Sequence, residues 1–317
     1  MAAKDHTVPQ MYLRRFAEKR KGSNKGSYIE AARADDIATV FSTEVRNVAS
    51  LNGFYTQTEE DGTEDRALDT FLSRIEDLAV PAFTHLLDSG RWAFPHPWPG
   101  LEETHRLRLS WFIAAQMLRT TRQRKRLAAL SGAEGLDMSS SLRDIESAND
   151  HARFISDQVS QLAFIVFHRP WGIGMSSACL LTSDTPVVIL NDHDADDQLA
   201  AASFWEILMP LDPHRFFYLP NASMVQEDTA KRVDHKLVLE GGMGHAVNQA
   251  VFDAADNFVF WHPRHGPQSL PQAFGRLPEP GSAEAWQKSE WYFSYSVMKA
   301  DDTIERKYLT QHPPVKG

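Results

Sequence analysis

The spacing of apolar residues changes twice along the 317-residue chain, and this change limits the fold more than any other feature. Residues 27–34 and 39–50 place Tyr, Ile, Val, Thr and Phe between polar residues, as strands do. Residues 63–168 instead repeat their apolar side chains at helical spacing, and strand-like segments return from residue 179 onward. This order predicts an α+β fold, with a small mixed or antiparallel sheet and a cluster of three or more long helices.

Three long helices are expected in the middle of the chain. The first begins at Thr63, the second near Leu101, and the third runs from Met138 to His168. One stripe of the first helix holds Leu68, Phe71, Leu72, Ile75 and Ala79, which predicts the face that it buries. Shorter elements are a helix after Pro9, strands in residues 204–220, a helix at residues 228–240 or 245–255, and a closing strand at residues 257–263.

The content of Pro, Gly and Ser rises after Pro263. We therefore expect one α+β domain of catalytic type over residues 1–263. A C-terminal appendage over residues 264–317 is expected to pack on it.

Composition argues against several classes of protein. The net charge of −9 disfavours a generally basic coat protein of nucleic acids, which leaves local basic patches to be considered. The one cysteine cannot form an intramolecular disulfide, which favours a reducing compartment. We recognise no secretory leader and no apolar run of membrane-spanning length. The expectation is a cytoplasmic protein without a membrane partner.

Two basic tracts stand out against this acidic background. The first holds Arg14, Arg15, Lys19, Arg20, Lys21 and Lys25, and the second holds Arg119, Arg122, Arg124, Lys125 and Arg126. On a helix, Arg119, Arg122 and Arg126 would share one face and could follow a phosphate backbone. The alternative is that both tracts are solvated helix ends and loops.

Polar residues on the long helices form a second candidate. Glu76 lies next to the apolar stripe of the first helix, while Gln116 and Arg119 share one face of the second. If these helices pack side by side, Glu76 meets Arg119, because a buried carboxylate needs such a partner. The pair either orients the two helices or supplies a catalytic carboxylate and a phosphate clamp.

Asp184 interrupts two apolar runs in residues 180–190, so we expect its carboxylate at a strand end or in a tight turn. There it would activate water or stabilise a cationic intermediate. The alternative is that it caps a turn of its own backbone.

Metal and nucleotide motifs are not found in the sequence. The acidic run at residues 191–197 lacks the spacing of an EF-hand, and the pair His262 and His265 is too short a signal for a metal site. One cysteine gives no zinc cluster. The glycines of residues 240–245 lack the Lys-Ser/Thr of a phosphate-binding loop, and no G-x-S-x-G elbow occurs. We therefore expect neither a metal nor another cofactor.

Several motifs together resemble a known family. They are H-x-V-P-x-x-Y-L-x-x-F at residues 6–16, S-D-x-P-V at residues 183–187, and the segments NGFYT, AAQMLRTTR, MPLDP and HAVNQA. The family is the bacterial and viral one catalogued as domain of unknown function 4238, and the resemblance spans about residues 5–263. It implies no activity, but it implies that motif positions are occupied by His6, Pro9, Tyr12, Leu13, Phe16, Arg119, Ser183, Asp184 and Pro186. Thr185 stands where the family usually has Asn, so that side chain receives no role.

The polar motif residues come from separate segments, as the residues of an enzyme site do. One Asp, one Glu and one His suit metal-free hydrolysis of an N-glycosidic bond better than two-metal nuclease chemistry. We therefore expect a DNA-acting hydrolase, first of all a metal-independent DNA glycosylase that excises bases, modified ones included, with phage defence as its suggested setting. The alternatives are a metal-dependent nuclease using Asp184 and the acidic run, and a non-catalytic nucleic-acid or protein-binding module.

The expected roles fall into three groups. The catalytic candidates are Asp184, Glu76 and His6. The substrate-binding candidates are Tyr12, Arg14, Arg15, Gln116, Arg119, Ser183 and Asn248. The candidates for contact with the DNA backbone are Lys19, Arg20, Lys21, Arg122, Arg124, Lys125 and Arg126.

Overall fold

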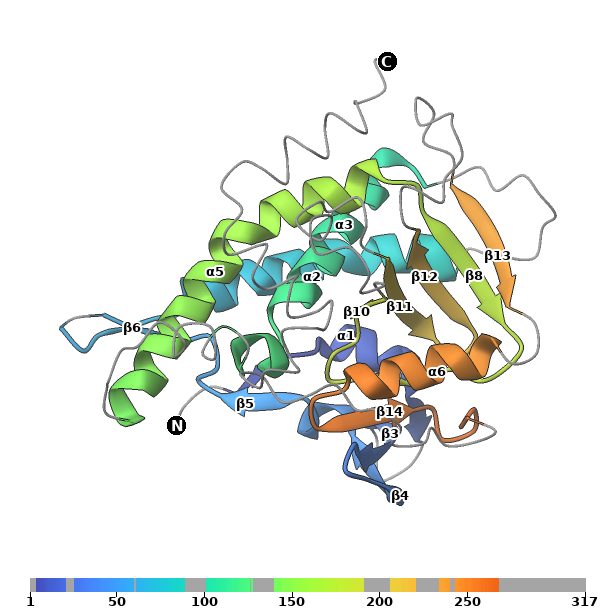
Figure 1. Cartoon of the computed structure of the whole chain (residues 1–317), viewed down its shortest axis with the longest axis horizontal. Coiled ribbons are helices and arrows are strands. Elements are labelled where there is room, and N and C mark those ends of the chain that lie inside the picture. Colours follow the sequence, from blue (N-terminus) through green and yellow to red (C-terminus); the bar gives the residue numbers. More distant parts are fainter. Residues whose placement is uncertain are drawn as a thin grey trace.

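Long helices lie beside antiparallel sheets in the computed structural model of the chain, which confirms the α+β class (Figure 1). The structure describes residues 4–20, 26–59, 61–88, 101–125, 127, 140–190, 206–220, 234–239 and 243–267. Lys21, Arg126, the acidic run and residues 268–317 lie outside the described residues. The C-terminal appendage therefore stays a prediction.

The three expected long helices are α2 (Ala67–Leu87), α3 (Glu103–Leu118) and α5 (Ser140–His168). α3 contacts both of the others. The expected stripe of α2 is buried at Leu68, Leu72, Ile75 and Ala79 and partly buried at Phe71. Phe83 of α2 meets Phe112 of α3 edge to face, with ring centroids 5.0 Å apart. The helices thus supply one side of the main apolar core.

The first sheet joins the two ends of the described chain. Its strands are, in spatial order, β2 (Glu18–Arg20), β3 (Gly26–Arg33), β14 (Phe258–Trp261) and β9 (Thr182–Ser183), and β4 (Asp36–Glu44) pairs with β3. β14 is antiparallel to both neighbours, with Val259 opposite Ala32 on one side and Ser183 on the other. The predicted closing strand is confirmed, and it holds the S-D-x-P-V segment near the N-terminal strands.

The second sheet contains, in order, β10 (Val188–Ile189), β11 (Ile207–Asp212), β12 (Arg215–Leu219), β8 (Gly172–Ser176) and β13 (His235–Leu239). All neighbours are antiparallel except β13 and β8, which are parallel. A helix over residues 228–240 was one of two expectations, and it is wrong for residues 235–239, which pair as a strand. The other is confirmed as α6 (Met243–Ala254).

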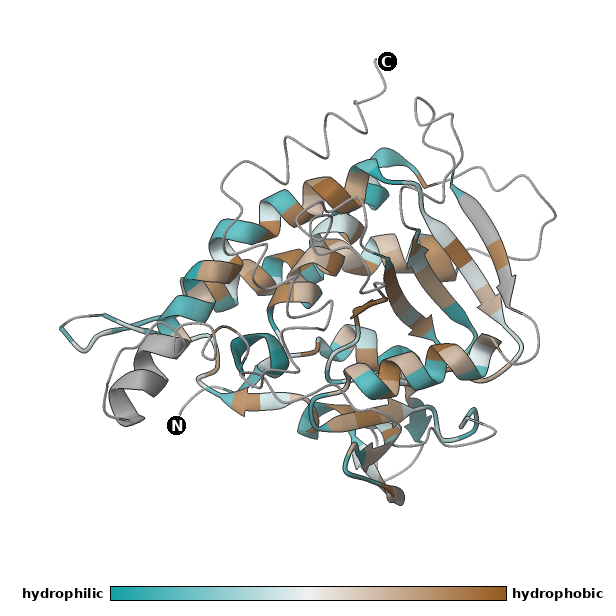
Figure 2. Cartoon of the chain, viewed as in Figure 1, coloured by the Kyte–Doolittle hydropathy of each residue, from teal (hydrophilic) through white to brown (hydrophobic). Residues whose placement is uncertain are grey.

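Helix α6 lies between the two sheets (Figure 1). Its residues Val251 and Phe252 join a second apolar cluster with Phe216 of β12 and Val259 of β14. In Figure 2, hydrophobic residues concentrate where the helices and strands face one another. A Cβ on Gly244 would lie 2.6 Å from Ser176 Oγ and 2.7 Å from the Ala178 Cβ, so this glycine lets α6 approach the end of β8 and the loop that follows it.

The N-terminal segment is a strand followed by a short helix. β1 (Lys4–His6) pairs with β5 (Ser50–Asn52), and after Pro9 come α1 (Gln10–Leu13) and the 3₁₀ turn η1 (Arg14–Phe16). A second turn, η2 (Val45–Asn47), and the short pair β6 (Gln57–Thr58) and β7 (Glu64–Asp65) follow. Tyr12, Leu13 and Phe16 are fully buried, which anchors the segment and leaves its arginines at or near the surface.

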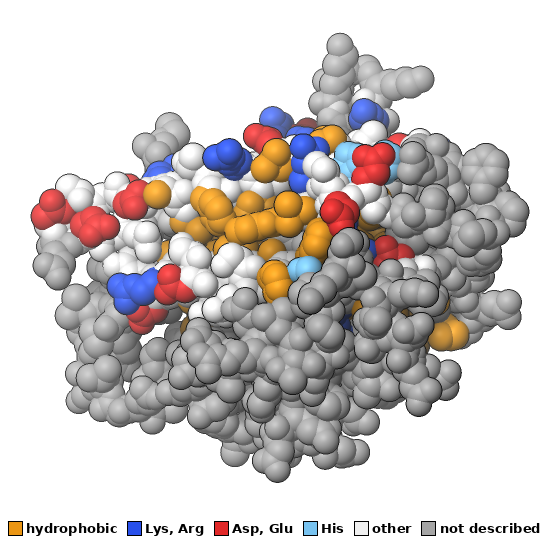
Figure 3. All heavy atoms as spheres, turned by 90° about the horizontal axis from the view of Figure 1, so that it is seen from above, with side chains coloured by type: hydrophobic (Ala, Val, Ile, Leu, Met, Phe, Trp, Pro, Cys, Tyr) orange, Lys and Arg blue, Asp and Glu red, His pale blue; other side chains and the backbone are white. Residues whose placement is uncertain are grey.

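One face of the molecule carries a band of apolar side chains (Figure 3). Among the helices that the structure describes, none combines the length and the apolar character that crossing a bilayer requires.

Candidate functional site

The histidine of the N-terminal motif is half-buried beside Arg46. Its Nε2 lies 3.3 Å from the Arg46 carbonyl oxygen, and because a carbonyl only accepts, Nε2 carries the proton. Burial lowers the pKa of His6, and the charges of Lys4 and Arg119 act in the same direction. The ring is therefore neutral near pH 7, with Nδ1 able to accept a proton.

Arg119 joins the N-terminal motif to the long helices. Its Nη1 donates to Glu76 Oε1 at 2.7 Å, its Nε donates to Tyr55 Oη at 2.9 Å, and its Nη2 donates to the carbonyl of His6. The predicted meeting of Glu76 and Arg119 is confirmed. The Arg119 side chain is 3% exposed and that of Glu76 is 24% exposed, so within this pair it is the Glu76 side chain that reaches solvent. We call His6, Tyr55, Glu76 and Arg119 the Arg119 cluster.

Sequence reasoning did not single out Asp5 or Tyr55, which support this cluster. Asp5 is buried, and its carboxylate accepts the backbone N–H of Tyr55 at 3.0 Å and Arg66 Nη2 at 2.6 Å. The Tyr55 hydroxyl also lies 3.3 Å from the carbonyl of His6. The sequence did contain a signal for both residues, because Asp5 directly precedes the motif histidine and Tyr55 belongs to the NGFYT segment.

The second basic tract is largely interior, which corrects the prediction that it lines a phosphate backbone. α3 ends at Leu118, so Arg119 and Arg122 do not continue its face. Arg122 is 7% exposed, and its Nη1 donates to the carbonyls of Ala254 at 2.7 Å and Asp253 at 3.2 Å. These carbonyls end helix α6, where a cation is favourable.

Arg124 is also occupied by the protein itself. Its guanidinium stacks on the Phe54 ring at 3.6 Å, donates to the Phe54 carbonyl, and donates through Nε to His151 Nδ1 at 3.2 Å. Burial lowers the pKa of Arg124 to about 10. Lys125, half exposed, pairs with Asp256 at 2.8 Å. Every cation of this tract that the structure describes thus has a partner within the chain.

Asp184 follows strand β9 directly, as predicted, but its carboxylate is used by the backbone. Oδ1 accepts the N–H of Asp256 at 2.8 Å, and Oδ2 accepts those of Asn257 at 2.7 Å and Phe258 at 3.1 Å. The residue is 5% exposed. Burial, with the charge of Asp256, raises the pKa of Asp184 to about 6. This arrangement caps the turn between α6 and β14 rather than a turn of its own backbone.

Four predicted substrate-binding residues lie in the interior. The Tyr12 hydroxyl donates to the carbonyl of Pro210 at 2.6 Å, and the Ser183 hydroxyl donates to that of Thr185 at 2.9 Å. The Asn248 amide bonds the backbone at Cys179 and Leu181. Gln116 is 1% exposed, and neither atom of its amide has a hydrogen-bond partner among the described residues. All four side chains are buried, and those of Tyr12, Ser183 and Asn248 bond the protein's own backbone, so their predicted contact with a substrate stays a prediction.

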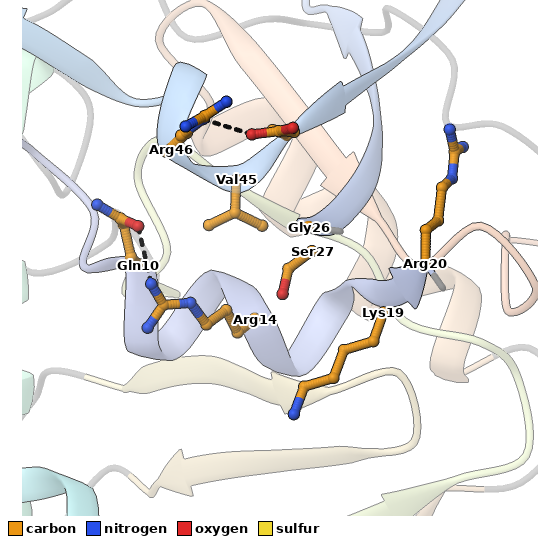
Figure 4. Close-up of a pocket in the computed structure, with 9 residues that line it drawn as sticks. Gln10, Arg14, Lys19, Arg20, Gly26, Ser27, Val45 and Arg46 are labelled. Carbon is orange, nitrogen blue, oxygen red and sulfur yellow. Dashed lines mark hydrogen bonds and ion pairs between the residues drawn. The ribbon is translucent and has the colours of Figure 1, made fainter. Parts of the chain in front are cut away.

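The first basic tract behaves differently and borders a hollow of about 440 Å³, which we call the basic hollow (Figure 4). It is lined by Gln10, Arg14, Lys19, Arg20, Gly26, Ser27, Glu44, Val45 and Arg46. Arg14 Nη2 donates to Gln10 Oε1 at 2.9 Å, and Arg20 Nη2 donates to Ser42 Oγ at 3.0 Å. Four cations face one acid, Glu44, which pairs with Arg46. Such a surface attracts anions.

Two more cations need separate treatment, Arg46 from outside the first tract and Arg15 from within it. Arg46, 71% exposed, was not singled out because it stands alone in the sequence, and only the pairing of β3 and β4 brings it to the hollow. Arg15 lies elsewhere, with Nη1 3.1 Å from Asp88 Oδ1, and lines a different hollow.

Comparisons with known proteins give a family and no activity. No curated protein and no solved structure matches the chain. A family model with the description "Protein of unknown function (DUF4238)" matches residues 4–265, which include His6, Glu76, Arg119 and Asp184. The chain therefore belongs to the DUF4238 family of proteins of unknown function.

Proposed function

We propose that the protein binds the phosphates of DNA in the basic hollow and hydrolyses an N-glycosidic bond beside it. The single observation that carries the proposal is the hollow itself, which four cations line from three elements: Arg14 from η1, Lys19 and Arg20 from β2, and Arg46 from η2. Arg and Lys neutralise phosphates and release their counterions, which supplies most non-specific affinity for DNA. The chain carries a net charge of −9, so these cations make the hollow a local site of attraction for phosphates on an otherwise acidic protein.

The Arg119 cluster is the proposed source of catalysis. Arg46, which lines the hollow, also accepts a hydrogen bond from His6, and Arg119 links the carbonyl of His6 to Glu76. The partly exposed carboxylate of Glu76 would position water and stabilise the cationic sugar. Neutral His6 would accept a proton from that water as the water oxygen bonds to the sugar, and would pass the proton to the base whose bond to the sugar breaks. Arg119 is a positioning residue that fixes both.

Of the two carboxylates predicted from the sequence, Glu76 is better placed than Asp184 to act in catalysis. Three backbone N–H groups occupy the oxygens of Asp184, whereas Glu76 Oε1 accepts a hydrogen bond from Arg119 and the Glu76 side chain reaches solvent. The same contacts weaken the nuclease alternative, because a metal would have to displace backbone donors from Asp184.

The proposal is tested by incubating the full chain with unmodified and modified phage DNA, with and without EDTA, and measuring alkali-labile sites and released bases. Glu76→Gln should lower the rate at least about 100-fold, because amides neither accept a proton nor carry charge. Asp77→Asn is the matched control, since Asp77 is the exposed carboxylate next along α2.

Other outcomes assign the function differently. Loss of strand cleavage in EDTA would favour a metal-dependent nuclease. Salt-dependent DNA binding with no product would favour a non-catalytic binding module, for which the interior position of Arg119 and the structural use of Asp184 already argue. Neither binding nor product would remove DNA from the proposal.

A further inference from the structure

Three side chains that are far apart in the sequence meet at one edge of the second sheet. Cys179 lies in the loop between β8 and β9, His214 lies in the turn between β11 and β12, and His265 follows β14. One ligand atom from each, the cysteine Sγ and a ring nitrogen of each histidine, lies within 4.8 Å of the other two. We call Cys179, His214 and His265 the Cys-His-His cluster.

The backbone holds the first two members in place. The N–H of Ser176 donates to the carbonyl of His214 at 2.8 Å, and the N–H of Leu180 donates to that of Pro213 at 2.7 Å. These bonds tie the cysteine loop to the histidine turn on both sides of Cys179.

Asn248 of α6 fixes the same loop from the other side. Its Nδ2 donates to the Cys179 carbonyl at 2.9 Å, and its Oδ1 accepts the Leu181 N–H at 3.0 Å. Gly244 permits this close approach of the helix, because a Cβ there would lie 2.7 Å from that of Ala178. A residue of the HAVNQA segment thereby acquires a role as a positioning residue for Cys179.

The two histidine rings face each other through nitrogens. His214 Nε2 lies 3.2 Å from His265 Nδ1, so one nitrogen must carry a proton for the other to accept. A metal ion can take the place of that proton. Two nitrogens bound to tetrahedral Zn²⁺ at about 2.0–2.1 Å are separated by about 3.3 Å. The spacing is therefore that of two ligands on one ion.

We propose that Cys179 Sγ, His214 Nε2 and His265 Nδ1 bind one borderline-soft divalent ion, with Zn²⁺ as the matching ion. Thiolate and imidazole together select such ions over Mg²⁺ and Ca²⁺, which prefer oxygen. Binding requires the cysteine to lose its proton.

Among the described residues no fourth ligand joins the cluster, so they would leave the fourth coordination position open. A hollow of about 440 Å³ borders the cluster and is lined by Arg15, Met175, Asp212, Pro213, His214, Arg215, His262 and His265. His262 is close to His265, with ring centroids 4.9 Å apart, but its Nδ1 accepts the N–H of Arg264. Three protein ligands and an open position are typical of catalytic rather than structural zinc sites. This proposal is independent of the proposed action on DNA.

The sole cysteine makes a direct test possible, because any thiol reaction in the full chain reports on Cys179. The metal-free protein is mixed with one equivalent of Zn²⁺, and the rate of maleimide alkylation is measured. We expect Zn²⁺ to slow alkylation at least about tenfold and EDTA to restore the rate, since the thiolate becomes a ligand. Co²⁺ in place of Zn²⁺ should add a thiolate-to-metal absorption band.

Variants separate this site from weak binding by the other histidines of the chain. Cys179→Ser, His214→Ala and His265→Ala should each weaken Zn²⁺ binding in calorimetry by at least about 100-fold, more than the usual loss of a supporting residue. His245→Ala is the matched control and should bind as the wild type does. Unchanged alkylation of the wild-type chain in Zn²⁺, which needs no substitution, would overturn the proposal. So would full protection in folded His214→Ala.

Discussion

The two basic tracts have similar composition and different surroundings. In the first, Arg14, Lys19 and Arg20 are exposed around the basic hollow. In the second, Arg119 and Arg122 are 2% and 7% exposed and donate to carbonyl and carboxylate oxygens of other segments. The difference lies in the acceptors, because a guanidinium is buried only where its donors are matched. A run of cations therefore indicates a ligand surface only after the acceptors brought by the fold are known.

The largest effect that we expect is a loss of stability on substitution of a buried arginine of the second tract. Arg119→Ala should lower the free energy of unfolding by about 3–5 kcal/mol, because it leaves Glu76, the Tyr55 hydroxyl and the His6 carbonyl without their shared donor. Urea unfolding measures the change. The exposed Arg74 of α2 is the control, and Arg74→Ala should stay within about 0.5 kcal/mol. A loss below about 1 kcal/mol for Arg119→Ala would mean that this tract is not structural.

The next largest effect that we expect is the fall in folding stability at low pH that His151, the partner of Arg124, causes. Burial, with the charge of Arg124, lowers the pKa of His151 to about 3, while the unfolded chain has a value of about 6.5. Below pH 6.5 the unfolded chain binds a proton that the folded chain does not. The stability that His151 contributes is therefore fully present above pH 6.5 and is lost as pH falls toward 3. Between pH 7 and pH 5 the loss is about 2 kcal/mol.

Comparison with His151→Gln isolates this loss from that of other titrating groups. A glutamine amide can still donate to the Leu118 carbonyl and accept from Arg124, the two partners of His151. Denaturant unfolding of both proteins at pH 7 and pH 5 should show the smaller fall for the variant. Equal falls would mean that His151 is protonated in the folded chain.

Features that depend on local sequence were predictable. The stripe of α2, the strand at residues 258–261 and the contact between Glu76 and Arg119 follow from helical and strand periods and from the need to pair a buried charge. Strand β13 was harder to predict from the sequence, because its parallel pairing with β8 is set by distant residues.

The roles of individual polar residues could not be predicted, because they depend on tertiary contacts with residues distant in the sequence. Asp184 accepts hydrogen bonds from backbone N–H groups more than 70 positions away, and Asn248 donates a hydrogen bond to the Cys179 carbonyl in the loop before β9. Neither partner could be identified from spacing. Motif membership therefore identified residues that matter but did not separate those that hold the fold from those that reach a ligand.

The smallest expected effect compares one exposed lysine from each tract. Lys19 lines the basic hollow, whereas Lys125 pairs with Asp256 at 2.8 Å. If Lys19 neutralises one phosphate, Lys19→Ala should reduce the slope of log affinity against log salt by about 0.9 on double-stranded DNA. Lys125→Ala should leave the slope unchanged, since its charge is already balanced within the chain. Fluorescence anisotropy at several salt concentrations measures both slopes. Equal reductions would contradict the division between a ligand-facing and a structural tract, because both lysines would then contact phosphate.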